Sequence, residues 1–388
     1  MNFKLDDEQQ MLQDSVRRFV DKDYSFEYRS TLLKARSGGS LARWQVFAQN
    51  GWLAAALPEA EGGLGGGIVD TALIAQEFGR GLVVEPYLGC AVLAAQTLVA
   101  GGTPKQRAAL LPALADGARK VALAYSEAGS RGFPEWVSCG AESVGDGYVL
   151  NGMKTLVLGG VEADAFIVST RMAGSGDGPD GISLFLVEAG TGGLSRQPLP
   201  LHDGTWAAEV TFDGVRVGAD SLLGEPGQGL AALRHGLAHG TAALCAELVG
   251  AMEKAVEITS EYLKVREQFG VPIGSFQALQ HRMADMAAEL ELARSMLFHL
   301  LASVTNDDAQ TLVRTVSQAK ALIGRAARFV CGQAIQLHGG IGMTEEYAVG
   351  HYYKRAVVAD ALFGRADQHE AACAAELQAT LIQTEGQA

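Results

Sequence analysis

The sequence lacks three features that define whole classes of protein: paired cysteines, long apolar runs and an excess of positive charge. The five cysteines are widely spaced and form no CxxC pair; they are Cys90, Cys139, Cys245, Cys331 and Cys373. This spacing argues against a disulfide framework and against a cysteine-based metal site. We therefore expect buried, reduced thiols and no bound metal.

No stretch of about 18 uninterrupted apolar residues occurs, so the sequence predicts no membrane span. The start of the chain, MNFKLDDEQQMLQDSVRRFV, has no apolar run after its basic residues and does not resemble a signal peptide. A cytoplasmic location is the resulting expectation. The chain carries 31 Lys and Arg against 44 Asp and Glu, a net charge of −13, which argues against a nucleic-acid partner.

Hydrophobic residues make up 48% of the 388 positions, enough for the two or three domains that a chain of this length usually forms. Helical spacing of apolar residues dominates residues 1–118. Short β-type runs separated by turns then occupy 119–225, and the helical period returns over 226–388. The sequence predicts a helical domain, a β domain and a second helical domain, with long helices near 228–265, 275–303, 308–338 and 345–380.

Two segments carry candidate binding chemistry. Arg266-Glu-Gln-Phe269-Gly ends one predicted helix, and Gln277 opens the next after a short turn. Gln336-Leu-His-Gly339-Gly340-Ile-Gly closes a later helix in a glycine cluster. An arginine with nearby amides can clamp phosphate, and a glycine-rich helix end can expose backbone N–H groups to it. Either segment alone is more often a solvated helix end.

Together, at this separation, the two segments resemble the FAD-binding segments of the acyl-CoA dehydrogenase family. The resemblance extends over almost the whole chain and includes Tyr125-Ser-Glu127, Asn151-Gly152 and Gly224-Glu-Pro-Gly-Gln-Gly229. It implies an α+β fold with a helical N-terminal domain, a middle β-barrel-like domain and a C-terminal four-helix bundle. It also implies FAD at a subunit interface, where the neighbour's clasp residues hold the adenosine diphosphate end. The matching residues here are Arg266, Phe269, Gln277, Gln336, Gly339 and Gly340.

The half of the family pattern that holds the flavin ring is less complete. Ser126 replaces a threonine as a hydroxyl donor, but Leu156 and Leu158 stand where the family has tryptophan and threonine. Leucine can neither stack like an indole nor donate a hydrogen bond. We expect weakened ring binding, with backbone groups as the remaining polar partners.

The catalytic base is the larger departure. Removing a proton next to a thioester carbonyl needs a carboxylate within hydrogen-bond reach. The resemblance places that carboxylate at Phe363, or in some members at Gly240 and Thr241, and none of these can act as a base. Asp360 and Asp367 flank the first position and are weak candidates for a relocated base; His239 adjoins the second.

The chain matches the family at the residues that clasp FAD but has no carboxylate at the base positions. This combination indicates a subunit that completes a partner's active site. The chain also resembles the small subunit of heteromeric enzymes such as pimeloyl-CoA dehydrogenase and the steroid side-chain enzymes. That branch implies an acyl-CoA thioester substrate, an electron-transfer flavoprotein as acceptor and a homologous partner in a dimer of dimers. Two alternatives remain: a non-catalytic scaffold subunit, and a homomeric flavoenzyme with a relocated base.

Overall fold

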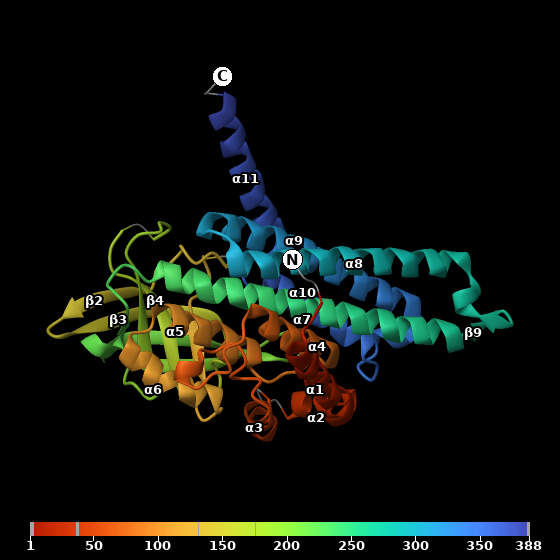
Figure 1. The fold of residues 1–388 in the computed structure, drawn as a ribbon, viewed down its shortest axis with the longest axis horizontal. Coiled ribbons are helices and arrows are strands. Elements are labelled where there is room, and N and C mark those ends of the chain that lie inside the picture. Colours follow the sequence, from red (N-terminus) through yellow and green to blue (C-terminus); the bar gives the residue numbers. More distant parts are fainter. Residues whose placement is uncertain (1–3, 36–38, 131, 175, 386–388) are drawn as a thin grey trace. The chain divides into compact units, whose positions relative to one another are not determined.

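The computed structural model describes residues 4–35, 39–130, 132–174 and 176–385 (Figure 1). The chain divides into two compact units. The first, called here the helical unit, consists of Met1–Phe26, Ala72–Val83 and Leu244–Ala388; the second, the sheet unit, consists of Glu27–Thr71 and Val84–Ala243. Both ends of the chain therefore belong to one unit, and its middle forms the other.

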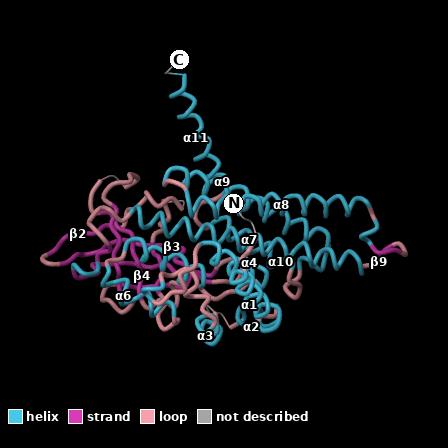
Figure 2. The backbone as a smooth tube through the Cα atoms, in the orientation of Figure 1, coloured by secondary structure: helices cyan, strands magenta, loops and turns pink. Residues whose placement is uncertain are grey.

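The sheet unit is built around an eight-stranded sheet, drawn in magenta in Figure 2. Seven strands follow the order β6-β7-β3-β2-β4-β5-β8, and β1 pairs in parallel with β4. Their bounds are β1 (Val121–Ala124), β2 (Gly140–Val144), β3 (Gly147–Leu158), β4 (Ala165–Arg171), β5 (Ile182–Glu188), β6 (Leu194–Pro200), β7 (Trp206–Gly218) and β8 (Leu222–Leu223). Buried Phe166, Phe185 and Phe212 form the centre of its core.

Short helices complete the sheet unit: α2 (Phe26–Lys34), α3 (Leu41–Gln49), α5 (Ala95–Gly101), α6 (Pro104–Ala115), the 3₁₀ turns η1 (Glu59–Glu61) and η3 (Ala219–Ser221), and the π-helix η2 (Tyr87–Ala94). The start of α6 follows from its sequence. The Thr103 hydroxyl accepts a hydrogen bond from the Gln106 amide, the Gln106 side-chain oxygen accepts one from the Thr103 amide, and Pro104 occupies the first helical position.

The helical unit contains α1 (Asp7–Asp23), α8 (Gln277–Asn306), α9 (Ala309–His338), α10 (Val349–Ala361) and α11 (Ala366–Glu385), with the short elements β9 (Glu267–Gln268), β10 (Val271–Pro272), η4 (Ile273–Ser275) and η5 (Gly339–Met343). Helices α4 (Ile68–Gly81) and α7 (Leu230–Val265) each have several residues in both units. Helix α9 packs against α8, α10 and α11 and is the central helix of this unit. Among the described helices, none is long and apolar enough to cross a membrane.

The continuous helix expected over 345–380 is wrong. The chain forms α10 and α11 instead, and the break lies at Leu362–Arg365. Phe363 and Gly364 both have left-handed backbones, with φ of 59° and 93°, which a right-handed helix cannot contain. The break places the segment that the family resemblance associates with the base in a loop rather than inside a helix.

Helices α4 and α7 cross closely inside the helical unit because each contributes a glycine. A Cβ atom added at Gly79 would lie 1.9 Å from the Glu247 carbonyl oxygen, and one added at Gly250 would lie 1.8 Å from that of Gln76. Neither contact tolerates a side chain. Ion pairs flank the crossing, including Arg80 with Glu257 at 3.1 Å.

Candidate active site

The two sequence motifs lie at neighbouring helix ends in the helical unit. The ring of Tyr262, near the end of α7, stacks on His338 at the end of α9 with centroids 4.4 Å apart. The Tyr262 hydroxyl also donates to the His338 carbonyl at 3.4 Å. Because Tyr262 stands four residues before Arg266 and His338 two after Gln336, this contact brings the two motifs together.

The first motif forms a hairpin whose tip is exposed. Strands β9 and β10 pair through Phe269-Gly270, and both residues have positive φ, 56° and 83°. A two-residue type I′ turn requires this geometry at both positions. Phenylalanine rarely adopts it, and the Phe269 side chain is 93% exposed. An exposed aromatic ring on a strained backbone is typical of a contact with a ligand or a partner.

The second motif leaves open space over its glycines. Gly339 has φ of 62°, and a Cβ added at Gly339 or Gly340 would meet nothing within 4 Å. The side chains of Arg266, Gln277 and Gln336 are exposed. One cation, two amides and an accessible backbone suit an anionic diphosphate.

His338 contributes a buried acceptor that sequence reasoning missed. Its Nδ1 lies 2.7 Å from the Ala334 carbonyl oxygen, which can only accept, so Nδ1 carries the hydrogen and Nε2 is the acceptor. Nε2 is buried and has no hydrogen-bond partner among the described residues. Burial lowers the pKa of His338. Because this atom is closed to solvent, the fit to the diphosphate end of FAD rests on the exposed Arg266 and amide side chains and on the open glycine surface.

The ring-holding segment lies in the sheet unit. Ser126 follows β1 and is buried, and its carbonyl accepts a hydrogen bond from the Thr155 amide at 2.9 Å. Leu156 and Leu158 are half-buried on β3. The backbone of Leu156 is left-handed, with φ of 51°, where the pairing of β3 with β7 shifts register. Leu156 therefore lies in the bulge of β3, and Leu158 lies in the paired strand beyond it, opposite Ala207.

A buried ion pair that the sequence analysis did not identify lies beside Ser126. Lys154 Nζ is 2.7 Å from Glu127 Oε1, and the two side chains are 0% and 5% exposed. Burial acts to raise the Glu127 pKa, but the charge and hydrogen bond of Lys154, with hydrogen bonds from Ser138 and Cys139, lower it overall. In the sequence, the only indication of this ion pair was a single lysine, Lys154, within the apolar second half of β3.

The loop that contains Phe363 is held by buried polar groups. The Phe363 carbonyl lies 2.8 Å from His369 Nε2, and the Gly364 carbonyl accepts from Lys320 Nζ at 2.9 Å. Lys320 is fully buried, and burial lowers its pKa. Phe363 itself is buried, and its ring carries no group that can take a proton.

The two aspartates near this loop already have partners. Asp360 Oδ1 accepts from the Ala366 amide at 3.2 Å, and Oδ2 lies 3.4 Å from Arg328. Asp367 forms an exposed ion pair with Arg365 at 2.5 Å. The hydrogen bond from Arg365 lowers the Asp367 pKa, which makes that carboxylate a weaker base.

The second base position lies on α7 within the sheet unit. A Cβ added at Gly240 would lie 2.2 Å from Leu93 Cδ2, and Thr241 is buried. The ring of neighbouring His239 lies 4.5 Å from that of His235. Burial, and then the proximity of His235, lower the pKa of His239 to about 3, so its imidazole is neutral near pH 7.

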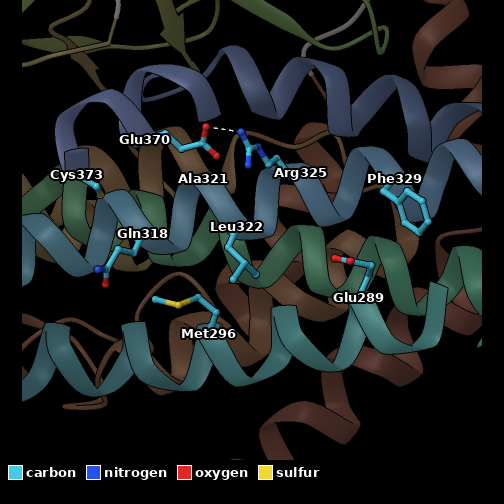
Figure 3. Close-up of a pocket in the computed structure, with 9 residues that line it drawn as sticks. All are labelled: Glu289, Met296, Gln318, Ala321, Leu322, Arg325, Phe329, Glu370 and Cys373. Carbon is cyan, nitrogen blue, oxygen red and sulfur yellow. Dashed lines mark hydrogen bonds and ion pairs between the residues drawn. The ribbon is translucent and has the colours of Figure 1, made fainter. Parts of the chain in front are cut away.

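A groove of about 740 Å³ runs along α8, α9 and α11 on the helical unit (Figure 3). Met296, Leu322 and Phe329 supply apolar surface, and Arg325 pairs with Glu370 at its edge. None of the motif residues lines this groove. No group of three metal-ligating side chains occurs in the described part of the chain.

The fold is that of a flavoprotein dehydrogenase. Family models of the acyl-CoA dehydrogenase N-terminal, middle and C-terminal domains match residues 6–118, 122–215 and 227–377, and the chain belongs to this family. It is an oxidoreductase of that family, with FAD as its cofactor.

A probable acyl-CoA dehydrogenase of Bacillus subtilis, YngJ, is 32% identical over 354 residues, which are 90% of this chain and 92% of YngJ. The butyryl-CoA dehydrogenase structure from Megasphaera elsdenii matches with a TM-score of 0.88 and 26% identity, covering 97% of this chain and 100% of that one. The structure of the ChsE4–ChsE5 complex from Mycobacterium tuberculosis matches with a TM-score of 0.87 and 27% identity, covering 97% and 99%.

Proposed function

We propose that this chain is a subunit of a heteromeric FAD-dependent acyl-CoA dehydrogenase. It supplies the FAD-clasping residues Arg266, Phe269, Gln277, Gln336, Gly339 and Gly340 to a homologous partner that carries the catalytic carboxylate. The reaction is α,β-dehydrogenation of an acyl-CoA thioester, with electrons passed to an electron-transfer flavoprotein. A dimer of dimers is the expected assembly.

The observation that carries this proposal is the state of the Phe363 loop. Dehydrogenation transfers a proton from the carbon next to the thioester carbonyl to a base, and a hydride from the adjacent carbon to FAD. Phe363 cannot take that proton. His369 and Lys320 hold the Phe363 and Gly364 carbonyls. Asp360 accepts from the buried Ala366 amide, and Asp367 is paired with exposed Arg365, so both nearby carboxylates are already engaged. The base must then come from another chain.

Two further observations support a partner. The exposed Phe269 ring and the open Gly339–Gly340 surface are suited to contact with a ligand that a second subunit shares. A homologue with a TM-score of 0.87 was solved as a complex of two proteins, ChsE4 and ChsE5. Both features favour a shared site over a scaffold that binds no flavin.

The test is expression of the chain alone and together with a base-bearing homologue, followed by measurement of flavin absorbance, subunit ratio and turnover. We expect FAD to be retained only by the mixed complex, with one flavin per pair at this clasp, and turnover only there. The variant Arg266→Gln should lose that flavin. Arg314→Gln, which alters an exposed arginine near the opposite end of α9, is the matched control and should keep it.

Other outcomes select the alternatives. A chain that binds a full complement of FAD alone and oxidises an acyl-CoA is a homomeric enzyme with a relocated base, and the proposal fails. A mixed complex whose flavin content is unchanged by Arg266→Gln makes this chain a scaffold. The flavin content of the Arg266→Gln complex therefore separates clasping from mere association.

A further inference from the structure

The sheet unit contains a charged group where a protein interior ordinarily has none. Lys154 is 0% exposed and lies on β3 among the residues of the sheet core. Burying an ammonium group and a carboxylate removes both from water, and such pairs are often no more stabilising than apolar residues of the same volume. The pair therefore calls for an explanation other than stability.

The contacts of Lys154 converge on the residues that flank Ser126. Its Nζ donates to the Tyr125 carbonyl at 3.2 Å and to Glu127 Oε1 at 2.7 Å. It also donates to the hydroxyl of Ser169 on β4 at 2.9 Å. One ammonium group thus holds the residue before Ser126 and the residue after it, and anchors both to the sheet.

Glu127 extends this support to the next segment of the chain. Its carboxylate accepts hydrogen bonds from the Ser138 amide at 2.9 Å, from the Cys139 amide at 3.0 Å and from the Ser138 hydroxyl. With Lys154, these donors occupy both carboxylate oxygens. These hydrogen bonds join Glu127 to Ser138 and Cys139, which lie further along the chain.

The residues after Lys154 form the bulge that faces Ser126. The Thr155 amide donates to the Ser126 carbonyl at 2.9 Å, and Leu156 keeps a left-handed backbone. Leucine has no intrinsic preference for that conformation, so surrounding structure must enforce it. Lys154 precedes these two residues directly and fixes the strand on which they lie.

We infer that Lys154 and Glu127 are positioning residues for a flavin ring at this chain's own sheet edge, which is kept although leucines replace its stacking and hydroxyl side chains. The pair holds the main chain of Ser126, Thr155 and Leu156 in place, so that backbone groups meet the ring. This inference rests on the proposed function, and it adds a second flavin to each pair of subunits. The partner's clasp would hold the other end of that flavin.

The test compares Lys154→Met with Lys120→Met in the complex with the base-bearing partner. Lys120 is a matched control: it pairs with Glu162 at 2.6 Å at the opposite end of β1, away from Ser126. Because Lys154→Met leaves Glu127 buried without its cation, the double variant Lys154→Met/Glu127→Gln provides a second form without that unpaired charge. Both single variants and the double variant are examined by amide hydrogen exchange and by flavin content.

We expect amide exchange at Thr155 and Leu156 to rise at least tenfold in the Lys154→Met and double variants, while exchange in β5 and β7 is unchanged. Flavin content should fall from two per pair to one, and Lys120→Met should change neither quantity. A uniform rise across the sheet unit, or a wild-type complex with one flavin per pair, overturns the inference. Loss of flavin in Arg266→Gln tests the proposed function separately, because that residue lies on the other unit.

Discussion

Replacing Phe269 by glycine should stabilise the free chain while it weakens FAD binding. The Phe269 backbone is left-handed with φ of 56°, a conformation whose steric strain costs a non-glycine residue about 1–2 kcal/mol and glycine almost nothing. The change removes an edge contact with the Phe276 ring, whose centroid lies 6.2 Å away. At a side chain that is 93% exposed, this contact is worth about 0.5 kcal/mol. The greater freedom of glycine in the unfolded chain costs a further ~0.5 kcal/mol, which leaves a net stabilisation of roughly 0.5 kcal/mol.

The effect on cofactor binding has the opposite sign. If the phenyl ring is covered when FAD binds, its loss removes about 2 kcal/mol of burial, which corresponds to roughly 30-fold weaker binding. Chemical denaturation of the apo chain measures the first quantity, and titration of the apo complex with FAD measures the second. Phe269→Asn is the control, because asparagine tolerates the left-handed backbone but cannot replace the ring.

Two results would refute this reasoning. A destabilised glycine variant would mean that the turn does not strain Phe269. Unchanged FAD affinity in both variants would remove Phe269 from the clasp. Phe276→Leu, which alters the neighbouring ring on an ordinary backbone, should show no gain in stability.

Three further predictions follow from buried contacts. Asp360→Asn should leave the turnover and the stability of the complex unchanged. Asp360→Ala should lower the free energy of unfolding by about 1–3 kcal/mol, because the buried Ala366 amide loses its acceptor. Loss of turnover in the asparagine variant would instead support Asp360 as a relocated base. His239 has a folded-state pKa near 3 against 6.5 for an ordinary histidine, so the unfolded chain takes up its proton first as pH falls. The contribution of His239 to the free energy of unfolding is therefore complete above pH 6.5 and falls below it by at most about 1.4 kcal/mol per pH unit. Denaturation from about pH 7 to 4 should show a shallower loss of stability for His239→Gln than for wild type. Gly250→Ala should lower the free energy of unfolding by about 3 kcal/mol or more, near the upper end of overpacking effects, because the added methyl group would meet the Gln76 carbonyl. A thermal midpoint equal to that of wild type would contradict the close helix crossing.

The long helices were predictable because their signals are local. The expected ranges 228–265 and 308–338 differ from α7 and α9 by one or two residues at their starts and agree at their ends. Apolar period sets the body of each helix, and Asp308 supplies a cap whose side chain accepts from the amides of Gln310 and Thr311. The two candidate binding motifs were likewise visible as contiguous strings, and their contact with FAD stays a prediction.

The features that escaped prediction depend on distant partners. Lys320 and His369 stabilise the break between α10 and α11, and no local sequence pattern predicts a left-handed backbone at Phe363. The pairing of Lys154 with Glu127 joins β3 to the loop after β1, and β-type periodicity gives no information about which polar residues meet. The close crossing of α4 and α7 likewise joins residues that are far apart in the sequence, such as Gly79 and Glu247.

That crossing has a consequence for synthesis of the chain. Helix α1 and the end of α4 emerge from the ribosome long before α7, whose Glu247 and Gly250 complete their packing. The sheet unit, encoded between them, can finish folding first, because domains generally fold as units in the order of their synthesis. The apolar faces of the N-terminal helices therefore stay uncovered until the last third of the chain has been synthesised.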